Sequence, residues 1–147
     1  MVVRLAIVAS SFNADIVDAM VDRARRRATK VGARVTHVVR VPGTFEIPLG
    51  LRRLLRRKDV DAAVALGAVI EGETDHDDLI ARAVAGKLLD LETEFGKPIG
   101  LGITGPGMTR AQAEARIDAA DRAVDAAVGM VTDKILPTSG HGGPRES

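Results

Sequence analysis

The chain has 147 residues, of which 46% are apolar, and this length and composition suit one globular domain with a substantial core. Lys and Arg number 21 against 20 Asp and Glu, and the resulting net charge of +1 gives no overall field to recruit nucleic acid or an anionic membrane. The absence of cysteine excludes disulfides, thiolate nucleophiles and cysteine-ligated metal centres.

The first predicted element is a strand over residues 2–9. This apolar stretch is interrupted by Arg4 and is too short for a membrane span or for the apolar part of a secretory signal, so we expect a cytoplasmic protein. The first helix is expected to follow Asn13 as its N-cap and to end before Gly32. Its inner face should carry Ile16, Met20 and Val21.

A second strand is predicted over residues 35–41. The helix that follows has apolar residues at helical spacing, which should face inward, namely Ile47, Leu51, Leu54 and Leu55. The same spacing turns four arginines outward, Arg52, Arg53, Arg56 and Arg57.

A third strand is predicted over residues 62–70, and the next helix should run from about Asp77 to Phe95 and stop at Gly96. The fourth strand covers residues 98–103. The last helix should begin near Thr109, where TRAQ resembles a capping box, and continue to about residue 136. Residues 137–147 are rich in Gly, Pro and Ser, so we expect a disordered tail after a folded domain of residues 1–136.

Alternating strands and helices predict parallel strands joined by crossover helices. The expected fold is a flavodoxin-like three-layer α/β/α sandwich with a four-stranded parallel sheet. Sheets of this kind bind ligands beyond the carboxyl ends of their strands. The segments that leave those ends read SSFN, VPGTFE, EGETDH and ITGPGMT, and we expect them to converge on one rim.

Two of the three aromatic residues, Phe12 and Phe45, belong to these rim segments, where a planar heterocycle can stack on them. The alternative is that each ring only fills its own loop. Glu46 follows the Pro42-Gly43 turn and is suited to accept hydrogen bonds from hydroxyls or an amine of a polar ligand. Alternatively, it stabilises the first turn of the second helix.

The segment Gly72-Glu73-Thr74 lies between a strand and a helix, so its backbone N–H groups and a hydroxyl are available to a phosphate. The same donors could merely cap the helix. Five nearby carboxylates mean that an anion also needs a cation, which Arg116 could supply as a bidentate partner. The alternative for Arg116 is a solvated helix arginine.

His76 is the candidate acid and base of the rim. The surrounding carboxylates should favour its charged form and keep its pKa near neutrality, where it can transfer a proton in either direction. The alternative is a surface histidine without function, which is how we interpret His37 and His141. No second histidine or carboxylate stands at a metal-ligand spacing from His76, so no metal is expected.

Four motifs occur in the order of a known family, namely SFN at 11–13, VPGTFEIP at 41–48, GAVIEGETDH at 67–76 and the stretch at 112–116. On these residues the chain resembles 6,7-dimethyl-8-ribityllumazine synthase over about residues 5–131, and EGET and GPGMTR look most like its archaeal branch. The resemblance implies a cofactor-free condensation of 5-amino-6-(D-ribitylamino)uracil with 3,4-dihydroxy-2-butanone 4-phosphate. The products would be 6,7-dimethyl-8-ribityllumazine, phosphate and water, in riboflavin biosynthesis.

The resemblance also implies the roles of individual residues. Phe12 would stack on the pyrimidine and His76 would carry the protons. The ribityl chain and the ring would be held by Thr44, Phe45, Glu46, Ala68, Val69 and Ile70. The phosphate would be bound by Glu73, Thr74 and Arg116.

Three positions depart from the family's usual pattern. Leu101 stands where many members have an aromatic residue that covers the ligand from the neighbouring subunit. Asp77 replaces an aromatic residue and Glu71 replaces an arginine. The resemblance implies a homopentamer in which a neighbour's segment 99–101 closes the site. Many relatives stack pentamers into an icosahedral shell of 60 subunits, and for this chain we leave the choice between pentamer and shell open.

Two alternative functions remain at this point. One is an archaeal-type riboflavin synthase paralogue, which dismutates two lumazines. The other is a non-catalytic shell protein that only binds a flavin or lumazine, for which His76 would be dispensable and Thr74 and Arg116 would have no role. For the lumazine synthase interpretation we expect small-molecule substrates and a homo-oligomer, with no nucleic acid and no membrane as partner.

Overall fold

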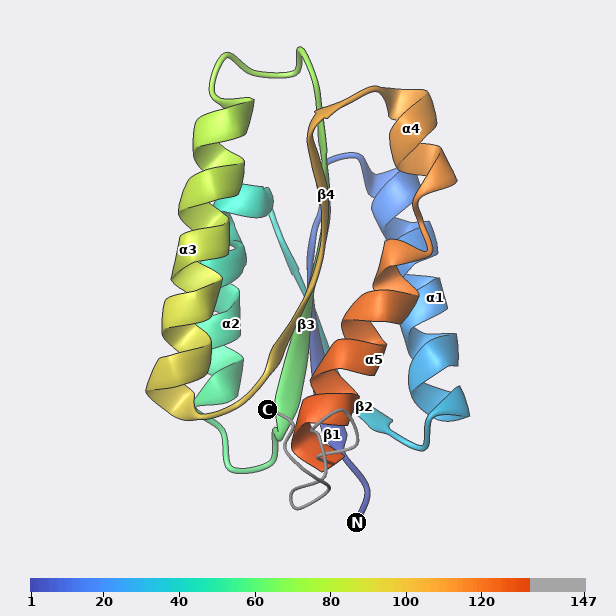
Figure 1. Cartoon of the computed structure of the whole chain (residues 1–147), viewed down its shortest axis with the longest axis vertical. Coiled ribbons are helices and arrows are strands. Elements are labelled where there is room, and N and C mark those ends of the chain that lie inside the picture. Colours follow the sequence, from blue (N-terminus) through green and yellow to red (C-terminus); the bar gives the residue numbers. More distant parts are fainter. Residues whose placement is uncertain (133–147) are drawn as a thin grey trace, which may run out of the picture.

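The structure is a computed structural model in which residues 1–132 are described. Its four strands form one parallel sheet in the order β2-β1-β3-β4 (Figure 1). The strands are β1 (Arg4–Ser10), β2 (Arg34–Val41), β3 (Ala62–Ile70) and β4 (Ile99–Met108). The expected disorder of residues 137–147 and the expected helix end near residue 136 lie outside the described residues.

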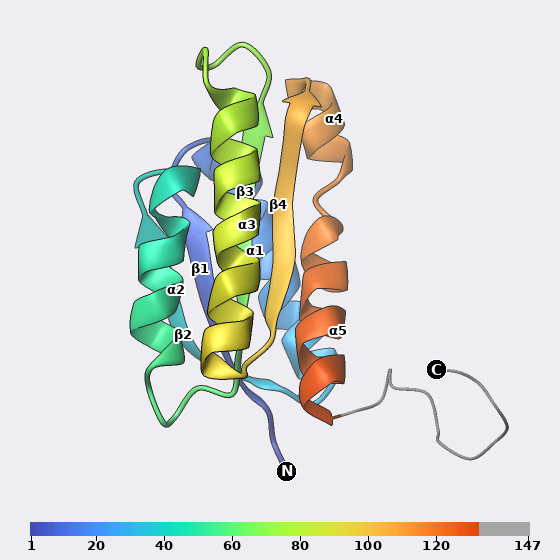
Figure 2. The same ribbon diagram turned by 60° about the vertical axis from the view of Figure 1, so that its left-hand side comes forward.

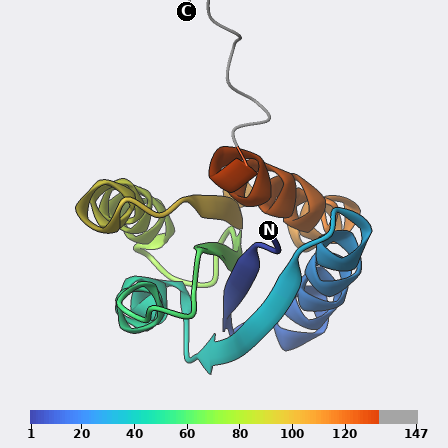
Figure 3. The same ribbon diagram turned by 90° about the horizontal axis from the view of Figure 1, so that it is seen from below.

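Helices cover both faces of the sheet (Figure 3). α1 (Ala14–Lys30) and α5 (Ala119–Thr132) pack on the face that carries Leu5, Ile7 and Leu66. α2 (Ile47–Leu55) and α3 (Asp77–Phe95) pack on the face that carries Val8 and Ala65. The three-layer α/β/α prediction is therefore confirmed. No helix within residues 1–132 combines the length and the apolar character needed to cross a membrane.

The central strand β3 is buried along its whole length. Its sequence, AAVALGAVI, is an almost continuous apolar run, as expected for a parallel strand that is covered by helices on both faces. In Figure 2, α3 runs along the outside of β3 and β4, with which it is in contact. A central strand covered in this way is accessible to a ligand only at its ends.

The first three helices agree with the sequence predictions. The residues expected on the inner faces of α1 and α2 are buried, and the four arginines of residues 52–57 are exposed. α3 ends at Gly96, whose positive φ of 63° explains the choice of glycine. Asn13 directly precedes α1, but its side chain makes no capping hydrogen bond to the helix.

The prediction of one long final helix is wrong. α4 (Arg110–Ala115) does begin with the capping box at Thr109, but the helix is interrupted after Ala115 and resumes as α5. At the break, the N–H groups of Ala119 and Ala120 donate to carbonyls three residues earlier. No glycine or proline marks this position. The break lets α5 pack on β4 and α1 while α4 stays at the end of the sheet.

The fourth strand is longer than predicted, because β4 continues through the Gly-Pro-Gly sequence to Met108. Glycine and proline are typical of loops, which is why the prediction ended at residue 103. At Gly105 the strand approaches β3 so closely that a Cβ would lie 2.1 Å from the carbonyl oxygen of Val69. The residue also has a φ of 97°, so only glycine fits here.

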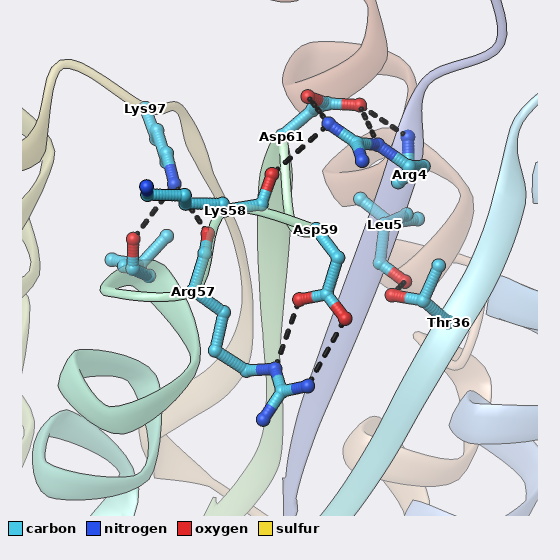
Figure 4. A network of polar contacts seen from close by, with 9 residues as sticks. Arg4, Leu5, Thr36, Arg57, Lys58, Asp59, Asp61 and Lys97 are labelled. Carbon is cyan, nitrogen blue, oxygen red and sulfur yellow. Dashed lines mark hydrogen bonds and ion pairs between the residues drawn. The ribbon is translucent and has the colours of Figure 1, made fainter.

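Charged side chains hold together the amino ends of the strands, opposite the expected ligand rim (Figure 4). Arg4 of β1 donates two side-chain hydrogen bonds to Asp61, just before β3, at 2.9 and 3.0 Å. Lys97, just before β4, donates to the backbone carbonyls of Leu55 and Arg57. The hydrogen bonds from Arg4 hold the pKa of the Asp61 carboxyl below its ordinary value.

Candidate active site

A pocket of about 220 Å³ lies at the carboxyl ends of β1 and β3. The chain leaves β1 toward β2 on one side and later reaches β3 on the other, so this is the point where the strand order reverses. The pocket is lined by segments that follow β1, β2 and β3, including η1 (Thr44–Glu46), and by the first turn of α3. Parallel α/β sheets bind their ligands in this position.

The structure brings most of the sequence-predicted site residues together. Those lining the pocket are Phe12, Thr44, Phe45, Glu46, Ala68, Val69, Glu73 and Thr74. Four predicted residues are not in its lining, Ile70, His76, Leu101 and Arg116. Ile70 is buried in the core on the α1 and α5 side of the sheet. The roles of all twelve remain predictions.

The two phenylalanine rings of the pocket are exposed. Phe12 is 52% exposed and Phe45 is 64% exposed, and neither belongs to the apolar core. A ring that only filled its own loop would be buried. The two rings come from different loops and border the same cavity, an arrangement that can hold a planar ligand.

Asn13 connects three parts of the site. It has a left-handed backbone conformation with φ 56°, which asparagine tolerates better than most residues. Its side-chain amide donates to the carbonyl oxygen of Ala68 and to Oε1 of Glu73, both at 3.0 Å. The sequence prediction treated Asn13 as a helix cap and missed this contact. The contact fixes the loop that carries Phe12 against β3 and the residues that follow it.

The segment between β3 and α3 turns at Gly72, which has a φ of 85°. Thr74 Oγ1 accepts a hydrogen bond of 2.7 Å from the backbone N–H of His76. The threonine hydroxyl therefore keeps its own proton for donation to a ligand. The His76 side chain is exposed at the N-cap of α3, next to the lining residue Asp77.

Sequence reasoning also missed three lining residues of the pocket, Gly43 just before η1 and the pair Asp77 and Ile80. This pair lies on the first turn of α3, and Ile80 donates its backbone N–H to the carbonyl of His76. The four-residue spacing between His76 and Ile80 places them on the same side of a helix, a signal that was present in the sequence. Within residues 1–132, no group of three His, Asp or Glu side chains is arranged to hold a metal ion.

Leu101 and Arg116 meet in a second hollow, beside the outer strand β4. This hollow has a volume of about 340 Å³ and also includes Ile103, Thr104 and Arg122. Leu101 is 57% exposed and Arg116 is exposed after the end of α4. The single chain thus places Leu101 and Arg116 in a cavity separate from the first pocket, while Ile70 and His76 line neither of the two.

The sequence matches the family model described as 6,7-dimethyl-8-ribityllumazine synthase over residues 2–134. A protein from Methanopyrus kandleri with this name is 52% identical over 129 residues, covering 88% of this chain and 92% of the relative. A protein of the same name from Archaeoglobus fulgidus is 50% identical over 129 residues, covering 88% of this chain and 90% of the relative.

A further relative with this name, from Staphylothermus marinus, is 52% identical over 129 residues, which are 87% of this chain and 86% of the relative. The matches extend over both cavities and over all four strands of the sheet. The chain therefore belongs to the 6,7-dimethyl-8-ribityllumazine synthase family.

Proposed function

We propose that this protein is a lumazine synthase, which condenses 5-amino-6-(D-ribitylamino)uracil with 3,4-dihydroxy-2-butanone 4-phosphate. Family membership and the name shared by relatives at about half identity support this assignment. The observation that carries it is the pocket at the strand-order reversal, where exposed aromatic rings border a loop of hydrogen-bond donors.

The proposed binding mode follows from the chemistry of the pocket lining. Phe12 stacks on the pyrimidine ring, while Thr44, Phe45 and Glu46 hold the ribityl chain. The ends of β3, at Ala68 and Val69, line the ring. Ile70 completes this segment through its backbone, since its side chain is buried on the opposite face of the sheet.

The phosphate of the second substrate binds in front of α3. Backbone N–H groups at Glu73 and Thr74 and the Thr74 hydroxyl are the donors, at the positive end of a helix of 19 residues. The Glu73 N–H would exchange its long hydrogen bond of 3.4 Å to the Ile70 carbonyl for the phosphate. His76 carries protons during Schiff-base formation, phosphate elimination and ring closure. The protein contributes mainly proximity and proton transfer, without a cofactor.

We infer that a neighbouring copy of the chain completes the site. Leu101 and Arg116 share a hollow that is separate from the first pocket, so a second subunit can bring both to the ligand together. Three further leucines of α2 and α3 are more than half exposed, Leu49, Leu79 and Leu89, and exposed apolar side chains of this kind favour burial between subunits.

The proposed assembly is a cyclic homopentamer as the minimum active unit. A closed ring uses one interface repeatedly, and it gives every pocket a neighbour's β4 edge. Whether pentamers stack further into a shell of 60 subunits stays open.

The function is tested by mixing the purified protein with both substrates and following the fluorescence of the lumazine. The proposal expects formation well above the rate of the spontaneous reaction. Formation of riboflavin from lumazine alone would instead identify a riboflavin synthase. Binding of lumazine without any acceleration would identify a non-catalytic binding protein.

A further inference from the structure

Ser10, the last residue of β1, carries a buried hydroxyl without a partner. The residue is 0% exposed, and within residues 1–132 its Oγ is the only fully buried side-chain nitrogen or oxygen that lacks a hydrogen bond. Unpaired hydroxyls are costly to bury and correspondingly rare in folded proteins. A bound ligand that completes the hydrogen bonds around such a group is one explanation for keeping it.

The Ser10 hydroxyl lies behind Thr44, a lining residue of the candidate active site. Alternation along β1 puts its side chain on the same face of the sheet as Val8, the face that is covered by α2 and α3. A Cβ added to Gly67 of β3 would lie 3.2 Å from Ser10 Oγ and 3.3 Å from Thr44 Oγ1. The two hydroxyls are thus neighbours above the same glycine, and Thr44 lines the pocket.

The backbone around Ser10 is fixed, so only the hydroxyl is free to reorient. The Ser10 carbonyl accepts a hydrogen bond of 3.1 Å from Nη2 of Arg40, and the N–H of Ser11 donates to the carbonyl of Val41 at 2.7 Å. Serine and threonine hydroxyls move between staggered rotamers at little cost when space is available. The missing side chain of Gly67 provides that space.

We propose that Ser10 is a positioning residue for the substrate that carries the ribityl chain, and that it acts through Thr44. When the substrate binds, Ser10 Oγ donates to Thr44 Oγ1, and Thr44 donates its own proton to a hydroxyl oxygen of the ribityl chain. Each hydrogen bond in such a chain polarises and strengthens the next. The inference rests on the proposed function, since it assigns the ribityl chain to this pocket.

A double-mutant cycle separates this role from a structural one. The variants are Ser10→Ala, Thr44→Val and the combination of both, assayed for lumazine formation. Ser10→Ala should raise the KM for the ribityl substrate by about 3- to 10-fold, the worth of one net hydrogen bond. The kcat and the KM for the butanone phosphate should change less than about twofold.

The decisive result is the effect of the same substitution when Thr44 is already valine. Because Ser10 acts through Thr44, the double variant should have the same KM as Thr44→Val alone. Additive effects of the two substitutions would overturn the proposed route. An unchanged KM in Ser10→Ala, with a melting temperature that only rises, would show that the hydroxyl is an unused buried group.

A matched control is Thr36→Val, which removes a partly buried hydroxyl at the opposite end of the sheet, where Thr36 donates to the carbonyl of Leu5. This variant should leave both KM values as in the wild type. An equal rise in KM for Thr36→Val would show a general effect of hydroxyl removal on the fold.

If the wild type itself forms no lumazine, the proposed function fails. If the wild type is active and Ser10→Ala is indistinguishable from it, only the present inference fails.

Discussion

Replacing Gly100 by alanine tests how closely β4 and α5 approach each other. A Cβ at this position would lie 2.0 Å from the carbonyl oxygen of Ala123 and 2.6 Å from its carbonyl carbon. Non-bonded carbon and oxygen atoms normally stay at least about 3.2 Å apart, so the helix has to move away from the strand by about 1 Å. The position of the new Cβ is fixed by the backbone of β4, and the atoms that it meets belong to the backbone of α5. No side-chain rotation can therefore relieve the clash.

Moving α5 disturbs a large part of the core, because Ala120, Ala123 and Val124 of this helix are fully or almost fully buried. Overpacking alone costs about 1–3 kcal/mol, and the loosened contacts of α5 bring the expected total to about 3–5 kcal/mol. In a domain of this size the melting temperature should fall by about 10–20 °C.

The matched control is Gly86→Ala in α3, where a Cβ would have no neighbour within 4 Å. Alanine is the better helix former, so this variant should gain about 0.5–1 kcal/mol. Thermal unfolding followed by circular dichroism, at one protein concentration for all variants, measures both effects. A Gly100→Ala protein that melts within about 2 °C of the wild type would refute the close packing described here.

Three further predictions concern the site and the acid stability of the fold. His76→Ala should lower turnover by about ten- to a thousandfold while leaving both KM values nearly unchanged, and steady-state kinetics that show less than a twofold loss would rule out a catalytic role. Arg116→Ala should raise the KM for the butanone phosphate far more than that for the aminouracil, whereas equal changes would assign Arg116 to the fold or the subunit interface. Asp61→Asn removes a carboxylate whose pKa is lower in the folded protein than in the unfolded chain. At a pH above its unfolded pKa the ionised carboxylate stabilises the folded state, and this stabilisation is lost as the pH falls through the pKa of the folded protein. The difference in unfolding free energy between Asp61→Asn and the wild type, measured in urea, should therefore shrink below about pH 4, and a difference that is constant with pH would contradict the ion pair with Arg4.

Most of the fold follows from local patterns in the sequence. Apolar runs gave the four strands, and helical spacing with end signals such as Gly96 gave the first three helices within a few residues. The end of β4 and the break after Ala115 were predicted wrongly. Both are fixed by tertiary packing, since Gly105 lies against β3 and α5 lies against β4 and α1, and local propensity contains no signal for such contacts.

The candidate site was predictable where its residues directly follow strands, because parallel strands bring their carboxyl ends to one edge. This rule accounts for Phe12, Phe45 and Thr74, which border the same pocket. It gives no information about side chains that act from beneath or between the loops. The bridging contacts of Asn13 and the unpaired hydroxyl of Ser10 became visible only with the three-dimensional structure.

The central claim is that lumazine forms at a site shared by two copies of the chain, and a mixture of two inactive variants tests it most directly. The two variants are His76→Ala and Arg116→Ala, assembled together in one ring. An Arg116→Ala chain keeps His76 beside its own pocket, and a neighbouring His76→Ala chain keeps the Arg116 that completes this pocket. At a low concentration of the butanone phosphate, each variant alone should be nearly inactive. A randomly mixed ring with equal amounts of both variants should recover about a quarter of the wild-type rate. In about that fraction of its interfaces, a pocket that keeps His76 meets a neighbour that keeps Arg116. A mixture that is no more active than the average of the two separate variants would contradict the shared site.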